Sequence, residues 1–154
     1  MTLSRRQVLG GGALFVGAAA LGVILRPGRS GGGRVLGARS AVLESVSEVF
    51  LPEGEAAAVV AAVDRFLADR GDPVLVSELL LGLAVVEHLG GGWTRRFSAR
   101  PLDERRSVMQ AWSVSGLGVK RQLFQALRRL ALFSFYADPR TWSSSGYDGP
   151  WVSP

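Results

Sequence analysis

The sequence predicts an all-α protein, a single bundle of about five helices, and three observations lead to this prediction. Apolar residues recur at every third or fourth position from residue 40 to residue 136, which is the spacing of a helix face. Proline and glycine interrupt this pattern at helix-length intervals. Asp72 followed by Pro73 is typical of a helix start, because aspartate caps free backbone N–H groups and proline suits the first turn.

The first two predicted helices lie on either side of Pro52. One begins at Ser40 and ends at Leu51, since proline stops a helix, and the other runs from residue 55 to residue 70 with Gly71 as its C-cap. Each has one apolar face, formed by Leu43, Val46, Val49 and Phe50 in the first and by Val59, Val63, Phe66 and Leu67 in the second.

The third predicted helix, residues 74–89, is apolar on nearly all sides and ends at three glycines, residues 90–92. A helix of this kind is expected to be the buried centre of its bundle. It carries the one histidine of the chain, His88, next to Glu87. Because adjacent residues on a helix do not face each other, we expect His88 to be a structural residue.

Two further helices complete the predicted bundle. The fourth starts at residues 101–104, where Asp103 and Glu104 suit the positive end of the helix dipole, and it carries Val108, Met109 and Trp112. The fifth covers residues 119–136. Its predicted inward residues are Leu123, Leu127, Leu130 and Phe133, and its outward residues are Lys120, Arg121, Arg128 and Arg129.

The helical domain, residues 40–137, is flanked by segments of different composition. Residues 26–39 are rich in glycine and arginine, lack an apolar period and are predicted to be a flexible linker. Residues 138–154 hold prolines and glycines that discourage a helix, yet also two tryptophans and a tyrosine. Since disordered tails are poor in aromatic residues, this aromatic tail is expected to dock on its own bundle or on a partner.

Residues 1–25 resemble a twin-arginine export signal. Ser4, Arg5, Arg6 and Leu9 match the S-R-R-x-F-L-K pattern, whereas Val8 and Gly10 replace its phenylalanine and lysine. Two guanidinium groups offer acidic receptor groups a planar set of donors that lysines would imitate poorly. The signal predicts export of a folded protein through the twin-arginine translocase, to the periplasm or the extracytoplasmic face of the membrane.

The apolar run of residues 8–25 leaves two outcomes open after export. Its 18 residues are at the lower limit for a membrane-spanning helix, so the segment can be kept as an anchor. It can also be removed, although Leu36-Gly37-Ala38 has leucine where a cleavage site prefers a small residue.

Composition excludes several kinds of function. The chain has no cysteine, which rules out disulfides, thiolate metal sites and cysteine nucleophiles. Its pI of 10.9 suggests nucleic-acid binding. However, residues 41–154 hold 12 basic and 13 acidic residues, a net charge of −1, so no nucleic-acid partner is predicted. No acid pair, metal cluster, phosphate loop or nucleophile elbow is recognisable, and we predict no catalytic, metal-binding or cofactor-binding residue in this chain.

The C-terminal half resembles the small third subunit, or gamma subunit, of gluconate 2-dehydrogenase-type flavoprotein dehydrogenases. The resemblance extends over residues 41–151 and is closest from residue 95 onward. It is carried by Phe97 and Ser98 before the helix start at residues 102–106, Trp112 with Ser115, Arg121 with Phe124, residues 136–139, Trp142, and residues 146–150.

The resemblance implies a non-catalytic, chaperone-like escort that stays bound to a large flavin-dependent dehydrogenase of the glucose-methanol-choline type. FAD would belong to that partner, and a cytochrome subunit can complete such a complex. The residues implied in the contact are Trp112, Tyr136, Trp142, Gly146, Tyr147, Gly149, Pro150 and Trp151. The alternative is a stand-alone structural protein anchored in the membrane by residues 8–25.

Overall fold

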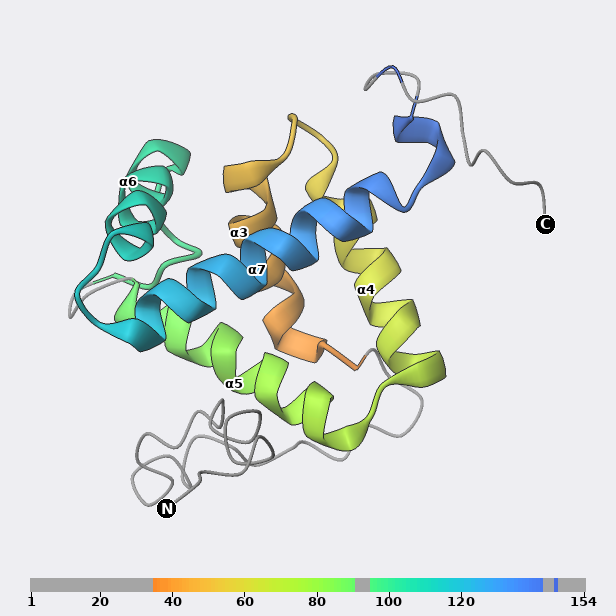
Figure 1. Ribbon diagram of the computed structural model, residues 1–154, viewed down its shortest axis with the longest axis horizontal. Helices are drawn as coiled ribbons and strands as arrows, with labels where there is room; N and C mark the ends of the chain where they lie inside the picture. Colours follow the sequence, from red (N-terminus) through yellow and green to blue (C-terminus); the bar gives the residue numbers. More distant parts are fainter. Residues whose placement is uncertain (1–34, 91–94, 143–145, 147–154) are drawn as a thin grey trace, which may run out of the picture.

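The computed structural model describes residues 35–90, 95–142 and 146, and over this part of the chain it is helical with no strand. Figure 1 shows the arrangement. The elements are η1 (Gly37–Arg39), α3 (Ser40–Phe50), α4 (Ala56–Arg70), α5 (Pro73–Leu89), α6 (Leu102–Ser113), α7 (Gly118–Tyr136) and η2 (Pro139–Thr141). The predicted all-α fold with about five helices is confirmed.

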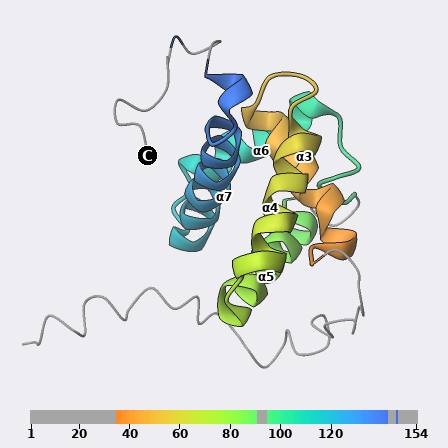
Figure 2. The ribbon, with the colours of Figure 1, turned by 90° about the vertical axis from the view of Figure 1, so that its right-hand side faces the viewer.

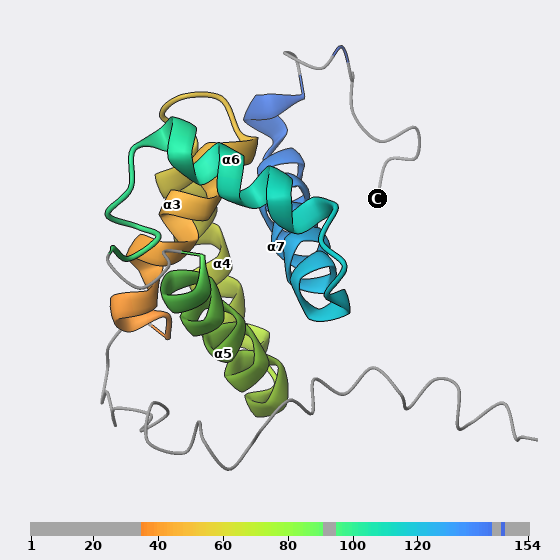
Figure 3. The ribbon, with the colours of Figure 1, turned by 90° about the vertical axis from the view of Figure 1, so that its left-hand side faces the viewer.

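Helix α3 is the centre of the domain. It contacts each of the other four α-helices, and α6 crosses both α3 and α7 (Figure 3). The side chains of Leu43, Val46 and Ser47 on α3 are all 0% exposed. The buried face of this 11-residue helix therefore lies at the centre of the core.

The prediction that residues 74–89 form the buried centre is wrong. Helix α5 buries only its C-terminal half, where Leu83 and Val86 are 0% exposed, while Val74 near its start is 64% exposed. The cap at this start is as predicted: the Asp72 side chain accepts a hydrogen bond of 2.7 Å from the Val74 N–H. Part of the less buried half of α5, including Leu75 and Leu79, borders a groove that is described below.

The folded domain begins before Ser40, inside the predicted linker. Leu36 is only 2% exposed, and its backbone N–H donates a hydrogen bond of 2.8 Å to the Asp64 carboxylate on α4. Gly37 adopts a φ of +50°, which turns the chain into η1. Residues 35–39 are thus part of the bundle, and the remainder of the predicted linker lies outside the described residues.

The buried face of α7 differs from the predicted one at its C-terminal end. Leu123 and Leu127 are buried as predicted, but the buried stripe continues through Ala131 and Phe135, four residues apart each time. Phe133 is 73% exposed, so its predicted inward position is wrong. On α4, Phe66 is likewise 53% exposed instead of buried. These two phenylalanines share another surface of the molecule.

Candidate binding surfaces

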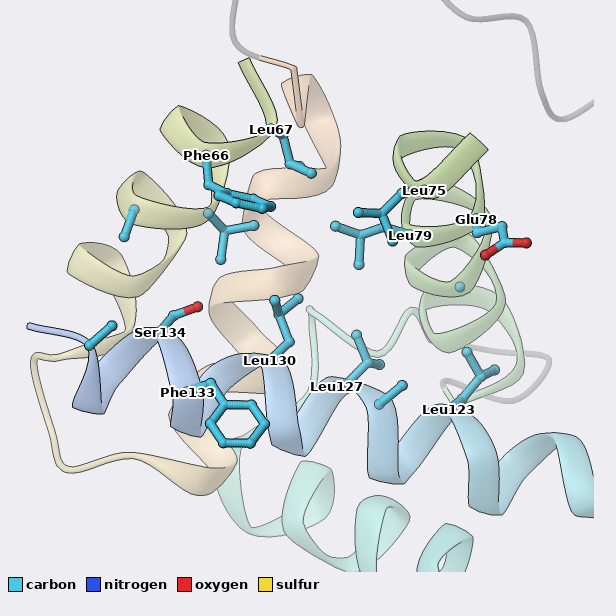
Figure 4. A pocket seen from close by; sticks show the side chains of 15 residues that line it. Phe66, Leu67, Leu75, Glu78, Leu79, Leu123, Leu127, Leu130, Phe133 and Ser134 are labelled. Atoms are coloured by element: carbon cyan, nitrogen blue, oxygen red, sulfur yellow. The ribbon is translucent and has the colours of Figure 1, made fainter. Parts of the chain in front are cut away.

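An apolar groove with a volume of about 630 Å³ is lined by α4, α5 and α7. Figure 2 shows α7 on one side of α4 and α5, and Figure 4 shows the side chains that the three helices contribute to the lining of the groove. Its lining residues are Ala62, Val63, Phe66 and Leu67 of α4, Leu75, Glu78, Leu79 and Gly82 of α5, and Leu123, Ala126, Leu127, Leu130, Phe133, Ser134 and Ala137 of α7 and its C-cap.

The groove is apolar and open to solvent. Glu78 is the one ionisable side chain among its lining residues. Phe66, Leu75 and Phe133 at its edges are 53%, 48% and 73% exposed. Contiguous exposed apolar surface of this kind marks a place where another apolar segment binds. Phe66 and Phe133, which were predicted to face inward, thus border the same groove as Leu75 of α5.

A smaller hollow of about 250 Å³ adjoins the groove at the C-terminal end of α7. The two share Ala62, Ser134 and Ala137 in their linings. The smaller hollow is more polar, since Glu55, Arg65 and Asp138 also border it. The surface thus changes from apolar between the helices to charged beside η2.

The start of the predicted aromatic tail folds back on the end of α7. The Trp142 Nε1–H donates a hydrogen bond of 2.8 Å to the Tyr136 carbonyl, and the Thr141 hydroxyl donates one of 3.0 Å to the Phe135 carbonyl. These bonds satisfy carbonyls that the end of a helix leaves without a partner. The Tyr136 ring remains 49% exposed, edge-on to Phe135 with the ring centroids 5.1 Å apart. Tyr136 is therefore placed where a partner can reach it.

An aspartate holds the turn that carries Trp142. The Asp138 carboxylate accepts hydrogen bonds of 3.0 Å from the Arg140 backbone N–H and 2.9 Å from its Nε. The Arg140 side chain, and then its backbone N–H, lower the pKa of Asp138 from 3.8 to about 2. The ionised carboxylate is thus the form that this turn favours.

The structure overturns one predicted contact residue and leaves several outside its description. Trp112 is only 4% exposed and lies in the core, with the Lys120 Nζ 5.6 Å from its ring centroid. It is a packing residue of the domain. Gly146 is exposed with a φ of +70°. The other predicted contact and signal residues, namely Tyr147, Gly149, Pro150, Trp151, Ser4, Arg5, Arg6 and Leu9, lie outside the described residues.

The sequence predicts a structural role for His88, but Glu87 is the buried residue of this pair. His88 is exposed, whereas Glu87 is 5% exposed and accepts hydrogen bonds of 3.0 Å and 2.7 Å from the backbone N–H and the hydroxyl of Ser98. The Glu87 carbonyl also accepts one from the Phe97 N–H at 3.1 Å. Glu87 therefore holds the segment that leads into α6. The signal for it was Ser98 itself, one of the residues that carry the family resemblance.

A second buried charge joins α6 to α3. Arg105 is 8% exposed, forms an ion pair with Glu48 at 2.6 Å and donates a hydrogen bond of 2.8 Å to the Ser45 carbonyl. The pairing explains why an arginine faces the interior of the bundle. Both contacts are structural, since neither lies in the groove or the adjoining hollow.

The described residues offer neither a metal site nor a membrane-spanning helix. No group of three or more histidine, aspartate or glutamate side chains there is placed to hold a metal ion. No helix in that part of the chain is long and apolar enough to cross a membrane, and residues 8–25 fall outside it.

Comparison with known proteins identifies a family. The model of the family described as gluconate 2-dehydrogenase subunit 3 matches residues 38–149, more than half of the chain and nearly all of the described domain. No curated protein and no solved structure matches the chain. The match begins at η1 and continues beyond η2. The chain belongs to the gluconate 2-dehydrogenase subunit 3 family.

Proposed function

We propose that this chain is a non-catalytic small subunit that binds a large flavin-dependent dehydrogenase and escorts it through the twin-arginine translocase. The observation that carries the proposal is the family match, because a family of dehydrogenase subunits implies association with a dehydrogenase complex. In this proposal FAD and the substrate site belong to a large partner of the glucose-methanol-choline type. A cytochrome subunit would then accept electrons from that partner.

The end of α7 is the part of the described surface that we assign to the large subunit. Tyr136 is half exposed and Trp142 is held beside it by a hydrogen bond, so both rings are presented with little freedom to lose on binding. Aromatic side chains of this kind are frequent anchors of protein interfaces. The tail residues Tyr147, Pro150 and Trp151 follow directly in the sequence and would extend the same contact.

The proposed route places the assembled complex at the periplasmic or extracytoplasmic face of the membrane. The sequence support is the pair Arg5 and Arg6 ahead of an uncharged run. The translocase that reads such pairs carries folded proteins, so a partner without its own signal can cross while bound. In this arrangement one signal serves two chains.

The experiment is co-expression of this chain with a candidate large flavoprotein dehydrogenase from the same organism, followed by fractionation. With Arg5→Lys and Arg6→Lys together, we expect both chains and the bound flavin to remain in the cytoplasm, because lysine cannot reproduce the planar donor set. The matched control is Arg26→Lys with Arg29→Lys, which keeps the pair intact and should export both chains. A large subunit that still reaches the periplasm without the arginine pair contradicts the escort role.

A second arm tests the assigned surface. Tyr136→Ala should weaken co-purification of the large subunit at least about tenfold, as truncating an interface anchor does. Gln110→Ala, at an exposed position of α6, should leave it unchanged. If the two variants co-purified equal amounts of the large subunit, Tyr136 would not be part of the contact. Recovery of this chain only from detergent-extracted membranes, without a flavin-bearing partner, would instead favour the stand-alone anchored protein.

A further inference from the structure

We propose that the apolar groove between α4, α5 and α7 binds the chain's own export segment, residues 8–25, before translocation. The proposal concerns this chain alone and does not depend on the large subunit. Three observations carry it: the chemistry of the two surfaces, their dimensions, and the point at which the N-terminal region joins the domain.

The chemistry of the segment suits the groove. Residues 8–25 contain only alanine, glycine, valine, leucine, isoleucine and phenylalanine, without a single charged or hydrogen-bonding side chain. The groove offers Phe66, Leu75, Leu79, Leu130 and Phe133, with Glu78 as its one ionisable group. Each surface is unfavourable in water, and contact between them removes both from solvent.

The dimensions agree as well. Along α7 and its C-cap the groove extends from Leu123 to Ala137, fourteen residue steps, which at about 1.5 Å per step is about 21 Å. A helical segment of about fourteen residues fills that length. Within residues 8–25, Leu14, Ala18, Leu21 and Leu25 recur at the spacing of one helix face. The five glycines of the segment keep its other faces narrow.

The N-terminal region joins the domain within reach of the groove. Leu36 is bonded to Asp64, and Val63 and Phe66 of the same helix line the groove. A helix is about 10 Å across, whereas the ten steps from residue 25 to residue 35 span up to about 35 Å. A segment tethered this closely has an effective concentration of about millimolar, so it competes well against untethered partners of similar chemistry.

Photocrosslinking of the full 154-residue chain, purified from the cytoplasm of cells that lack the translocase and the large subunit, tests the proposal. The photoreactive amino acid p-benzoylphenylalanine replaces Phe66 or Phe133 in the groove. The control carries it at Val114, which is 75% exposed at the C-cap of α6 and is not a lining residue. After illumination, mass spectrometry of the digested monomer identifies the captured peptide. We expect residues 8–25 from the groove positions and not from position 114.

A charge placed in the groove provides the second measurement. Ala126→Glu introduces a carboxylate at an exposed groove position of α7, and we expect it to lower capture of residues 8–25 at least about tenfold, because the bound segment cannot pair with it. Ala111→Glu, the same change at an exposed position of α6, should leave capture unchanged. Circular dichroism confirms that both variants fold.

Several results would overturn the proposal. These are capture of the tail residues 147–154, capture of a second copy in a crosslinked dimer, capture of no peptide, and equal capture by Ala126→Glu and the unmodified chain. None of these results bears on co-export with the large subunit, which the arginine-pair experiment tests separately.

Discussion

The carboxylate of Glu87, near the end of α5, accepts two hydrogen bonds from Ser98, one from its backbone N–H and one from its hydroxyl. Its own carbonyl accepts a third bond from the neighbouring Phe97 N–H. Phe97 is 0% exposed, so one residue of α5 fixes both a core side chain and the backbone that leads into α6. The contact joins two parts of the chain eleven residues apart.

We expect Glu87→Ala to lower the free energy of unfolding by about 1–3 kcal/mol, because the Ser98 N–H would lose its acceptor in a partly buried place. Urea denaturation followed by circular dichroism measures it. Glu78→Ala is the matched control, being the same substitution on the same helix at an exposed position, and should change stability by less than about 0.5 kcal/mol. Equal effects of the two would mean that the Glu87 bonds contribute nothing.

Arg105→Leu should destabilise the domain by about 1–3 kcal/mol. The buried guanidinium bonds the Ser45 carbonyl and pairs with Glu48, but the Glu48 side chain is 43% exposed and can return to water, which limits the loss. The neighbouring Arg106→Leu breaks a 3.6 Å pair with Asp103 whose side chains are 54% and 95% exposed, and it should change little. Chemical denaturation of both variants decides whether burial makes the difference.

Leu36→Ala should lower stability by about 2–4 kcal/mol, since it removes a core side chain and leaves a cavity. Leu89→Ala, at a position 62% exposed, serves as its control and should cost less than about 1 kcal/mol. Thermal denaturation of the two variants compares them. If Leu36→Ala left the thermal stability unchanged, residues 35–39 would belong to the linker and not to the folded domain.

The turn at Asp138 gives a pH prediction. Because the folded pKa of about 2 lies below the ordinary value of 3.8, the ionised carboxylate is favoured in the fold. Its contribution is complete above pH 3.8 and is lost as the pH falls through about 2. Carboxyl NMR should therefore show Asp138 titrating near pH 2. Arg140→Gln should raise that pKa toward 3.8, whereas Arg129→Gln on α7 should not move it.

Local signals in the sequence predicted the helices because the residues that start and stop them act on their neighbours. The cap of Asp72 on the Val74 N–H needs nothing from outside the segment. The burial of each face was harder to predict. On α7, a stripe through Leu130 and Phe133 and one through Ala131 and Phe135 both satisfy helical spacing, and only contacts with other helices select between them.

The residues whose burial was predicted wrongly from the sequence all depend on contacts with distant parts of the chain. Glu87 and His88 are neighbours, and which of them turns inward depends on Ser98, a residue beyond the helix. The groove could not be predicted either, because it depends on how three helices pack together. Phe66 and Phe133 each have the spacing of a core residue within their own helix. Leu36 and Val35 are two apolar residues in a glycine-rich stretch, too few to show an apolar period. The partner of Leu36, Asp64, lies 28 residues away.

If the chain is exported as proposed, the burial of Leu36 restricts where a peptidase can then cut it. A peptidase cutting after Ala38 would remove Leu36 from the core and break its bond to Asp64. Any cut that spares the domain must fall ahead of Val35. A cut within residues 26–34 would leave a product that begins with part of this arginine- and glycine-rich stretch, a short cationic leader on a domain with almost no net charge of its own.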